Sequence, residues 1–144
     1  MSNYAHKNCI YKKCIVFWKD YLRWLSTCLF IFIHIYKFMK HLTNEDFEST
    51  IANWVTLVDF FADRCGPCKI LSKLMPRLEL RYEDNNLVTI AKVDTESQKY
   101  LAGIHNIRSL PTVIIYKNGV EQQRIVWLLP PQAYADAIDS ALAG

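Results

Sequence analysis

The chain has 144 residues, which is enough for one domain with a hydrophobic core. Its 51% apolar and 22% charged residues are typical of a globular protein and exclude a disordered one. The formal net charge of +3 is too small to indicate a nucleic-acid-binding surface, so no nucleic-acid partner is expected.

The first 38 residues differ from the rest of the chain in charge and composition. They hold six lysines and arginines against one acid, ten of the nineteen aromatic residues, and no glycine or proline. Because folded domains need turn-forming residues, we place a boundary near residue 38 and predict a separate domain over residues 39–144.

Three interpretations of this N-terminal segment stay open. Residues 24–36 are thirteen uncharged residues, fewer than the roughly 20 apolar residues that a membrane-spanning helix needs. The segment is a short anchor or interfacial helix, with membrane contact confined to residues 14–37, or an extension that the working protein lacks, or an integral part of the fold. In the second case synthesis would start at Met39.

Apolar patterns beyond residue 38 alternate between the strand period and the helix period. In chain order they predict a helix beginning at Thr43, a strand over 55–61, a helix over 69–82, a strand over 87–93, a short helix over 95–103, a strand over 112–116, a turn at 117–119, a strand over 122–128 and a helix from Pro130. A short leading strand before Thr43 fits the same pattern.

Two of these helices place apolar residues on one face, as expected for helices that cover a sheet. The residues are Ile70, Leu71, Leu74, Leu78 and Tyr82 in the first, and Tyr134, Ala137, Ile138 and Ala141 in the last. Alternating strands and helices predict an α/β fold whose mostly parallel sheet has helices on both faces. The hairpin at 117–119 adds antiparallel strands at one edge.

Cys65-Gly66-Pro67-Cys68 lies between the buried strand and the helix that follows it. Two cysteines three residues apart at a helix start share one face and can form a disulfide. The loop that this bond closes is very short, so the bond adds little stability, which favours a reversible, working disulfide. Unpaired N–H groups at the helix N-terminus favour a thiolate at Cys65, which is predicted to attack, while a more buried Cys68 resolves the mixed disulfide.

Half of a zinc site is the alternative interpretation of these two cysteines. It needs two further ligands, but His41 and His105 are isolated, and Cys9, Cys14 and Cys28 have no metal-site spacing. No metal site is therefore predicted.

One carboxylate, Asp59, interrupts the apolar strand over 55–61. Burial raises the pKa of a carboxyl group, which would suit a general base for the Cys68 thiol. Lys92, in the next parallel strand, is placed to neutralise Asp59. The alternatives are an Asp59 and a Lys92 that simply face solvent.

Pro111 directly precedes the strand over 112–116. Proline is unusual at the start of a central strand, and a cis Leu110–Pro111 bond would account for it. The alternative is a trans proline that begins the strand.

From about Met39 to Ala143 the chain resembles the thioredoxin family. The matching stretches are Leu-Val-Asp-Phe-Phe-Ala-Asp-Arg-Cys-Gly-Pro-Cys-Lys, Ile-Ala-Lys-Val-Asp, Ile-Arg-Ser-Leu-Pro-Thr and Tyr-Lys-Asn-Gly. The resemblance implies the thioredoxin fold, in which helices flank a central mixed sheet on both faces. It also implies the reduction of disulfide bonds in substrate proteins.

The resemblance further assigns roles to individual residues. The nucleophile, the resolving cysteine, the buried aspartate, its lysine partner and the cis-proline fall on Cys65, Cys68, Asp59, Lys92 and Pro111. Substrate-binding positions fall on Arg64, Gly66, Pro67, Leu110, Pro111 and Trp127. The family needs no cofactor beyond its cysteine pair and is recharged by a flavin-dependent reductase that uses NADPH, so a flavoenzyme of this kind and protein disulfides are the expected partners.

Two departures from the family touch its partner-binding surface. Arg64 stands where the family has tryptophan, and Trp127 stands where it has glycine. The charge of Arg64 is expected to favour the Cys65 thiolate, and Arg64 is expected to stack on the Trp127 ring. We therefore expect the chemistry to be retained and the set of partners to differ.

A cytoplasmic, monomeric disulfide reductase is the leading interpretation. One alternative is a thiol oxidant or isomerase outside the cytoplasm, anchored through the N-terminal segment. Another is a redox-inactive binding module that keeps the fold for its surface. The Gly-Pro pair between the cysteines resembles reductases more than isomerases, and the intact Cys65 and Cys68 argue against an inactive module.

Overall fold

The computed structural model describes residues 39–144. The predictions for the N-terminal segment and for Cys9, Cys14 and Cys28 fall outside these residues. Met39–Gly144 form one compact unit. Within it, no helix is long and apolar enough to cross a membrane.

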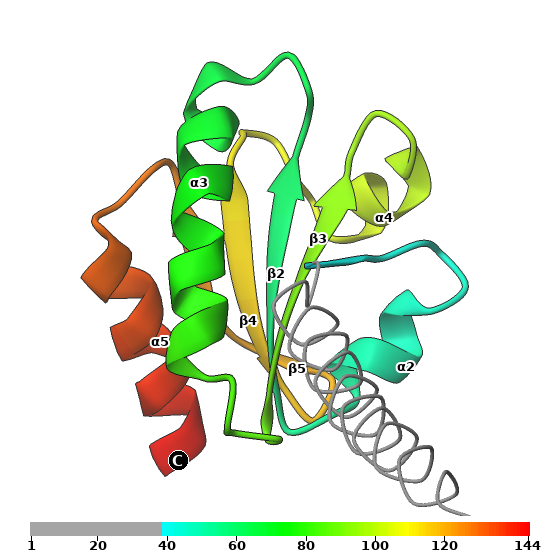
Figure 1. The fold of residues 1–144 in the computed structure, drawn as a ribbon. Helices are drawn as coiled ribbons and strands as arrows, with labels where there is room; N and C mark the ends of the chain where they lie inside the picture. Colours follow the sequence, from blue (N-terminus) through cyan, green and yellow to red (C-terminus); the bar gives the residue numbers. More distant parts are fainter. Residues whose placement is uncertain (1–38) are drawn as a thin grey trace, which may run out of the picture. The chain divides into compact units, whose positions relative to one another are not determined.

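Five strands and four helices follow one another along this unit (Figure 1). They are β1 (Lys40–His41), α2 (Phe47–Ile51), β2 (Val55–Phe61), α3 (Gly66–Arg81), β3 (Val88–Asp94), α4 (Lys99–Ile104), β4 (Thr112–Lys117), β5 (Val120–Val126) and α5 (Pro131–Ala143). The strands form one sheet in the order β1-β3-β2-β4-β5. β1, β3 and β2 are parallel, while β4 and β5 are each antiparallel to the neighbouring strand, which confirms the predicted mixed sheet.

The helices cover both faces of the sheet, as predicted. Leu71, Met75 and Leu78 of α3 pack with residues of α5 and with one face of β2. Phe47 and Ile51 of α2 pack with Leu101 of α4 and with the other face. β2 is therefore buried on both sides, which explains why most of its residues are apolar.

The side chains of β2 alternate between these two cores. Val55 and Leu57 face α3 and α5, whereas Val58 and Phe60 face α2 and α4. Asp59, two residues beyond Leu57, therefore points to the α3 side, near the end of the strand from which the chain enters α3. The fold thus places the Asp59 carboxylate on the same side of the sheet as α3, at whose start the cysteine turn, Cys65–Cys68, lies.

Four local predictions need correction. Ile70 was expected on the buried face of α3, but it is 53% exposed. The buried residues of α3 are Cys68, Leu71, Met75 and Leu78, so Met75 lies in the core where Ile70 was expected. The helix expected from Thr95 begins at Lys99 instead, since Thr95 donates its N–H and its hydroxyl to the Phe61 carbonyl at 2.9 and 3.0 Å.

β5 also begins earlier than expected, at Val120 rather than at residue 122. Asn118 and Gly119 both have positive φ, of 51° and 81°, and together form a tight two-residue turn. The returning strand can therefore pair at once, and Val120 lies opposite Lys117.

The N-terminus of α2 differs from the predicted hydroxyl cap. Thr43 donates its N–H and its hydroxyl to the Asp46 carboxylate, at 2.6 and 3.1 Å, and it is the Thr43 carbonyl, not the hydroxyl, that accepts the N–H of Phe47, at 3.1 Å. The helix therefore starts at Phe47, with Asp46 as the residue before it.

Candidate functional site

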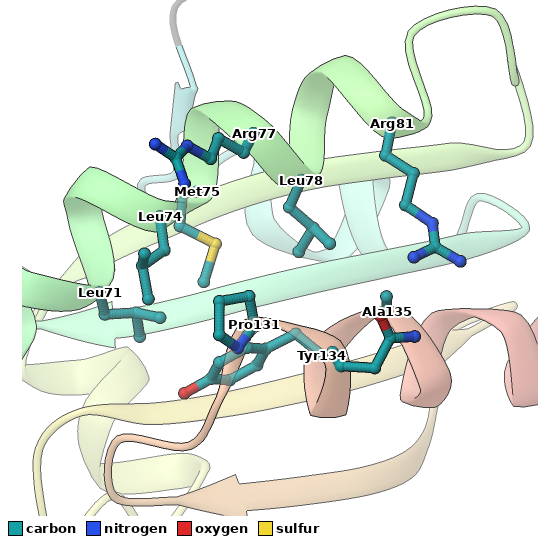
Figure 2. A pocket seen from close by; sticks show the side chains of 10 residues that line it. Leu71, Leu74, Met75, Arg77, Leu78, Arg81, Pro131, Tyr134 and Ala135 are labelled. Carbon is teal, nitrogen blue, oxygen red and sulfur yellow. The ribbon is translucent and has the colours of Figure 1, made fainter.

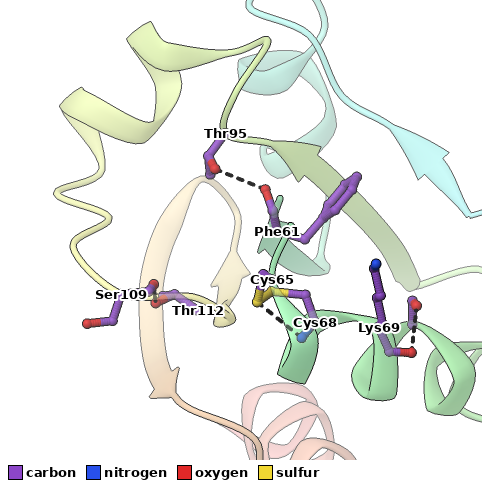
Figure 3. Close-up of a disulfide and its surroundings, with 8 residues drawn as sticks. Phe61, Cys65, Cys68, Lys69, Thr95, Ser109 and Thr112 are labelled. Carbon is purple, nitrogen blue, oxygen red and sulfur yellow. Dashed lines mark hydrogen bonds between the residues drawn. A yellow bond between two sulfur atoms is a disulfide. The ribbon is translucent and has the colours of Figure 1, made fainter. Parts of the chain in front are cut away.

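Cys65 and Cys68 lie at the junction between the β2–α3 connection and the first turn of α3 (Figure 3). Their sulfurs form a disulfide, with an S–S distance of 1.97 Å and a Cα–Cα distance of 5.2 Å. The structure thus shows the oxidised form of the pair that the sequence predicts. Gly66 and Pro67 between them are exposed, and Pro67 occupies the first turn of α3, where its missing N–H leaves no intrahelical bond unmade.

The two sulfurs differ in exposure and in hydrogen bonding. Cys65 is half-buried and caps α3, because its Sγ accepts the N–H of Cys68 at 3.2 Å and its carbonyl accepts the N–H of Lys69 at 3.3 Å. Cys68 is only 2% exposed. An incoming sulfur can therefore reach Cys65 from outside, while Cys68 can reach only a partner already attached to Cys65.

Asp59 is buried, at 1% exposure, which excludes the solvent-facing alternative. Among the described residues its Oδ1 has no hydrogen-bond partner. Burial raises the pKa of the Asp59 carboxyl to about 7, against a weaker opposing effect of the Lys92 charge. A carboxyl group with this pKa can both release and accept a proton near neutral pH.

Lys92 is the direct neighbour of Asp59 in the sheet, since β2 and β3 pair in register at these two residues. Its side chain is half-buried, and its Nζ lies 5.3 Å from the centre of the Phe61 ring. The aliphatic stem therefore covers part of the sheet while the ammonium group supplies positive charge beside Asp59.

The segment before β4 borders the disulfide, as Figure 3 shows for Ser109 and Thr112. The Leu110–Pro111 peptide bond is cis, as predicted. The Thr112 hydroxyl donates to the Ser109 carbonyl at 2.7 Å and closes the turn. Pro111 is buried and Leu110 is half-buried, so this segment forms a fixed apolar border beside the cysteines.

The two departures from the family pattern lie on the surface. Arg64 is 92% exposed, and its Nε lies 3.9 Å from a carboxylate oxygen of Glu96. The expected stacking of Arg64 on Trp127 is wrong: the cation–π pairs within the described residues are Arg81 with Tyr82 and Lys92 with Phe61. Glu96 therefore places an opposite charge next to the guanidinium of Arg64.

A cavity of about 120 Å³ occupies the seam between α3 and α5 (Figure 2), and neither cysteine lines it. Within residues 39–144, no three His, Cys, Asp or Glu side chains lie together as a set of metal ligands. Gly66 and Pro67 next to Cys65 are exposed, so a substrate protein can approach the half-buried Cys65 from this side.

Tyr134 is a site-supporting residue whose role the sequence did not reveal. The sequence predicts Tyr134 on the buried face of the last helix, and it is buried there. Its hydroxyl also accepts the N–H of Leu129 at 3.0 Å, which fixes the loop between β5 and α5. The sequence did offer a signal for this role, because a tyrosine on an otherwise aliphatic buried face needs a hydrogen-bond partner for its hydroxyl.

Comparison with known proteins agrees with this geometry. A family model described as Thioredoxin matches residues 38–140. A thioredoxin of Staphylococcus aureus is 33% identical over 101 residues, which are 70% of this chain and 95% of the relative.

Two solved structures have similar folds. The oxidised mitochondrial thioredoxin 3 of Saccharomyces cerevisiae superposes with a TM-score of 0.65 and 26% identity, covering 74% of this chain and 98% of that one. A chain from a study of thiol resolution in a yeast mitochondrial 1-Cys peroxiredoxin by glutathione and thioredoxin systems also gives 0.65, with 27% identity, covering 73% of this chain and 97% of that one.

Proposed function

The chain belongs to the thioredoxin family of thiol–disulfide oxidoreductases, and we propose that it works as a reductase of protein disulfides, with Cys65 as nucleophile and Cys68 as resolving thiol. The observation that carries this proposal is the unequal burial of two bonded cysteines, with Cys65 half-buried at the cap of α3 and Cys68 only 2% exposed.

The reaction begins from the dithiol form. The Cys65 thiolate attacks one sulfur of the substrate disulfide, a mixed disulfide forms, and the other substrate sulfur leaves as a thiolate and takes up a proton. The Cys68 thiol then loses its proton and attacks the Cys65 sulfur. The second substrate sulfur leaves, and two electrons have passed to the substrate as the Cys65–Cys68 disulfide forms.

Asp59 is the group proposed to take the proton from Cys68. It lies on the α3 side of β2, and burial brings its pKa to about 7. Lys92 moderates this effect, because its positive charge beside Asp59 favours the carboxylate. Together they keep an available base near the resolving thiol at neutral pH.

Arg64, Gly66, Pro67, Leu110, Pro111 and Trp127 are the proposed substrate-binding residues. They come from the cysteine turn, the segment before β4 and the end of β5. An exposed cysteine turn beside a fixed apolar border suits an extended segment of a substrate protein.

Reduction of the Cys65–Cys68 disulfide completes the cycle. We propose a flavoenzyme resembling thioredoxin reductase as the source of electrons, with NADPH bound by that enzyme and no cofactor in this chain. A monomer in the cytoplasm is the form we propose to carry out this exchange.

Insulin reduction tests the proposal. The full chain with a small dithiol should accelerate precipitation of the insulin B chain well beyond the dithiol alone, and the Cys65→Ser, Cys68→Ser double variant should not. A wild-type chain that gives no acceleration would overturn the proposed function. Equilibration with glutathione then distinguishes a reductase from an oxidant, because an oxidant would remain dithiol under conditions in which a reductase is oxidised.

A further inference from the structure

Trp127 adopts a backbone conformation that bulky residues avoid. Its φ is +76°, in the left-handed region where a Cβ crowds the backbone and glycine is favoured. The residue directly follows β5, where the chain turns toward α5. A positive φ of this size is expected without strain only at glycine, or at an asparagine in a turn.

Packing in the core does not explain this conformation. The Trp127 side chain is 62% exposed, and its neighbours Val126 and Leu129 are also exposed, at 37% and 40%. An unfavourable backbone angle that displays an aromatic ring to solvent points to a role in binding, because such outliers persist mainly where function needs them.

The loop that carries Trp127 is fixed at two points. The Trp127 N–H donates to the Pro111 carbonyl at 3.0 Å, and the Leu129 N–H donates to the Tyr134 hydroxyl at 3.0 Å. Tyr134 is itself held in the core, and Figure 2 shows its ring extending beneath α3, on the side of Leu71. The indole is therefore attached to a backbone whose position is set by the rest of the fold.

The hydrogen bond to Pro111 also places Trp127 beside the redox site. Pro111 lies between Ser109 and Thr112, which border the disulfide in Figure 3, and Thr112 pairs directly with Val126. The Trp127 backbone is therefore bonded directly to the segment that borders the disulfide, and its exposed side chain starts from there.

We propose that Trp127 is a specificity-determining residue that binds a bulky apolar side chain of the substrate next to its disulfide, with Tyr134 as the positioning residue that holds it. This inference rests on the proposed function and names the substrates favoured at the same site. A rigid, exposed indole supplies a large contact area with little loss of conformational freedom on binding. Substrates with a small polar residue at that place make no such contact.

Two disulfide-linked peptides that differ in one residue test the proposal. Each carries its cysteine followed by either leucine or serine, and the full chain in its reduced form is assayed for kcat/KM on both. Wild type should favour the leucine peptide by at least about tenfold, as expected for burial of one apolar side chain. In Trp127→Gly this ratio should fall to about twofold or less, through a higher KM for the leucine peptide. Glycine adopts the positive φ freely, so this variant should fold.

Trp54→Gly is the matched control. Trp54 is also largely exposed, at 58%, but it directly precedes β2, at the opposite end of that strand from Cys65. The ratio should stay at the wild-type value in this variant. An equal fall in Trp54→Gly and Trp127→Gly would overturn the proposal, because a general loss of stability would then explain both.

Tyr134→Phe tests the positioning role. It keeps the ring in the core and removes the hydroxyl that accepts the Leu129 N–H. The ratio should fall by about threefold, again through the KM for the leucine peptide, while the KM for the serine peptide stays constant. An unchanged ratio would overturn the role of Tyr134.

The wild-type result distinguishes an error in the specificity proposal from an error in the proposed function. If wild type reduces both peptides equally well, the specificity proposal is wrong and the proposed reductase function stands. If wild type reduces neither peptide and fails with insulin, the proposed function itself is wrong.

Discussion

Cys65 combines the two properties that a nucleophilic sulfur needs. Its sulfur is accessible, and it accepts an N–H at the start of a helix, where negative charge is stabilised. Cys68 has the opposite surroundings, because it is buried in the apolar stripe of α3. The same four-residue turn therefore creates two thiols of different accessibility.

This difference predicts the behaviour of single cysteine variants. Cys68→Ser should accumulate mixed disulfides with substrate proteins, because Cys65 can attack but nothing resolves the product. Cys65→Ser should accumulate none, since Cys68 is shielded. Non-reducing gels of both variants, with and without added dithiol, make the comparison. Equal trapping by the two variants would show that the roles are wrongly assigned.

Asp59→Asn should slow the exchange reaction by about 10- to 100-fold at neutral pH, because the amide cannot accept the Cys68 proton. Insulin reduction measured from pH 6 to 8 is the assay. Wild-type rates should rise as the Asp59 carboxyl ionises around pH 7, and the variant should lack this rise. Identical pH profiles in both proteins would exclude Asp59 as the base.

Asp59 should also reduce stability at neutral and alkaline pH. Between pH 3.8 and about 7 the folded protein keeps a proton on Asp59 that the unfolded chain has released, so the free energy of unfolding falls as the pH rises through this range. Asp59→Asn removes this dependence and should raise the free energy of unfolding at pH 8 by roughly 2–4 kcal/mol. At pH 4 the two proteins should be similar. Urea unfolding at both pH values makes the measurement, and a less stable variant at pH 8 would contradict it.

The residues of the redox site were largely predictable, for identifiable reasons. Asp59 is evident because a carboxylate inside an apolar run is costly unless it is used, and Pro111 because proline rarely begins a central strand. The conformation of Trp127 was not predictable, because no local sequence pattern predicts a positive φ at an aromatic residue. The Arg64–Glu96 pair was missed since its partners are distant in the chain and come together only in the folded turn.

On the α2 side of the sheet, an aromatic cluster joins four elements. His105, at the end of α4, lies with its ring centre 4.6 Å from that of Phe47 in α2, 5.9 Å from Phe60 in β2 and 5.8 Å from Tyr116 in β4. Its Nδ1 is 3.0 Å from the Tyr116 hydroxyl, and its buried Nε2 has no partner among the described residues. The cluster thus adds ring contacts between four elements that also meet in the apolar core on this face of the sheet.

This cluster should weaken in acid. Burial lowers the pKa of His105 below its ordinary value of 6.5, with the nearby Arg124 charge acting in the same direction against Glu48 and Glu121. The unfolded chain therefore binds a proton below pH 6.5 more readily than the folded protein does, and the free energy of unfolding falls as the pH falls. His105→Gln, which does not titrate, should lose less stability between pH 7.5 and 5.5 than wild type, as measured by urea unfolding. An equal loss in both would exclude His105 as the acid-sensitive group.

At the level of the elements, periodicity predicted the strands and helices better than their ends. Strand β2 was clear because most of its residues are apolar, and helix α5 was clear because its apolar residues recur at the helical spacing. Ile70 was misplaced because it fits the helical spacing of apolar residues in α3, although its side chain does not pack against the sheet. The start of α4 was misplaced because Thr95 bonds to Phe61, a tertiary contact that no local pattern reveals.

For the molecule as a whole, Met39 is the expected limit of truncation. Met39 and Leu42 are buried in the two cores, and β1 between them pairs in parallel with β3. A chain that begins at Met39 should fold and reduce insulin as the full chain does. A chain that begins at Thr43 should be less stable by roughly 3 kcal/mol or more, because it loses two buried side chains. Thermal unfolding and insulin reduction of both chains make the test, and an unfolded Met39 chain would contradict it.

The order of the sheet has a consequence for self-association. Open strand edges tend to recruit other chains into a shared sheet and so promote aggregation. Within residues 39–144 the edges are β1, which has only two residues, and β5, whose middle carries Glu121, Gln122, Gln123 and Arg124. The Arg124 and Glu121 side chains bond to each other at 2.8 Å, which keeps charge on that edge. The sheet that carries the exposed Trp127 next to its redox site thus ends in one short edge and one charged edge. We therefore expect concentrated protein to resist association through its strand edges.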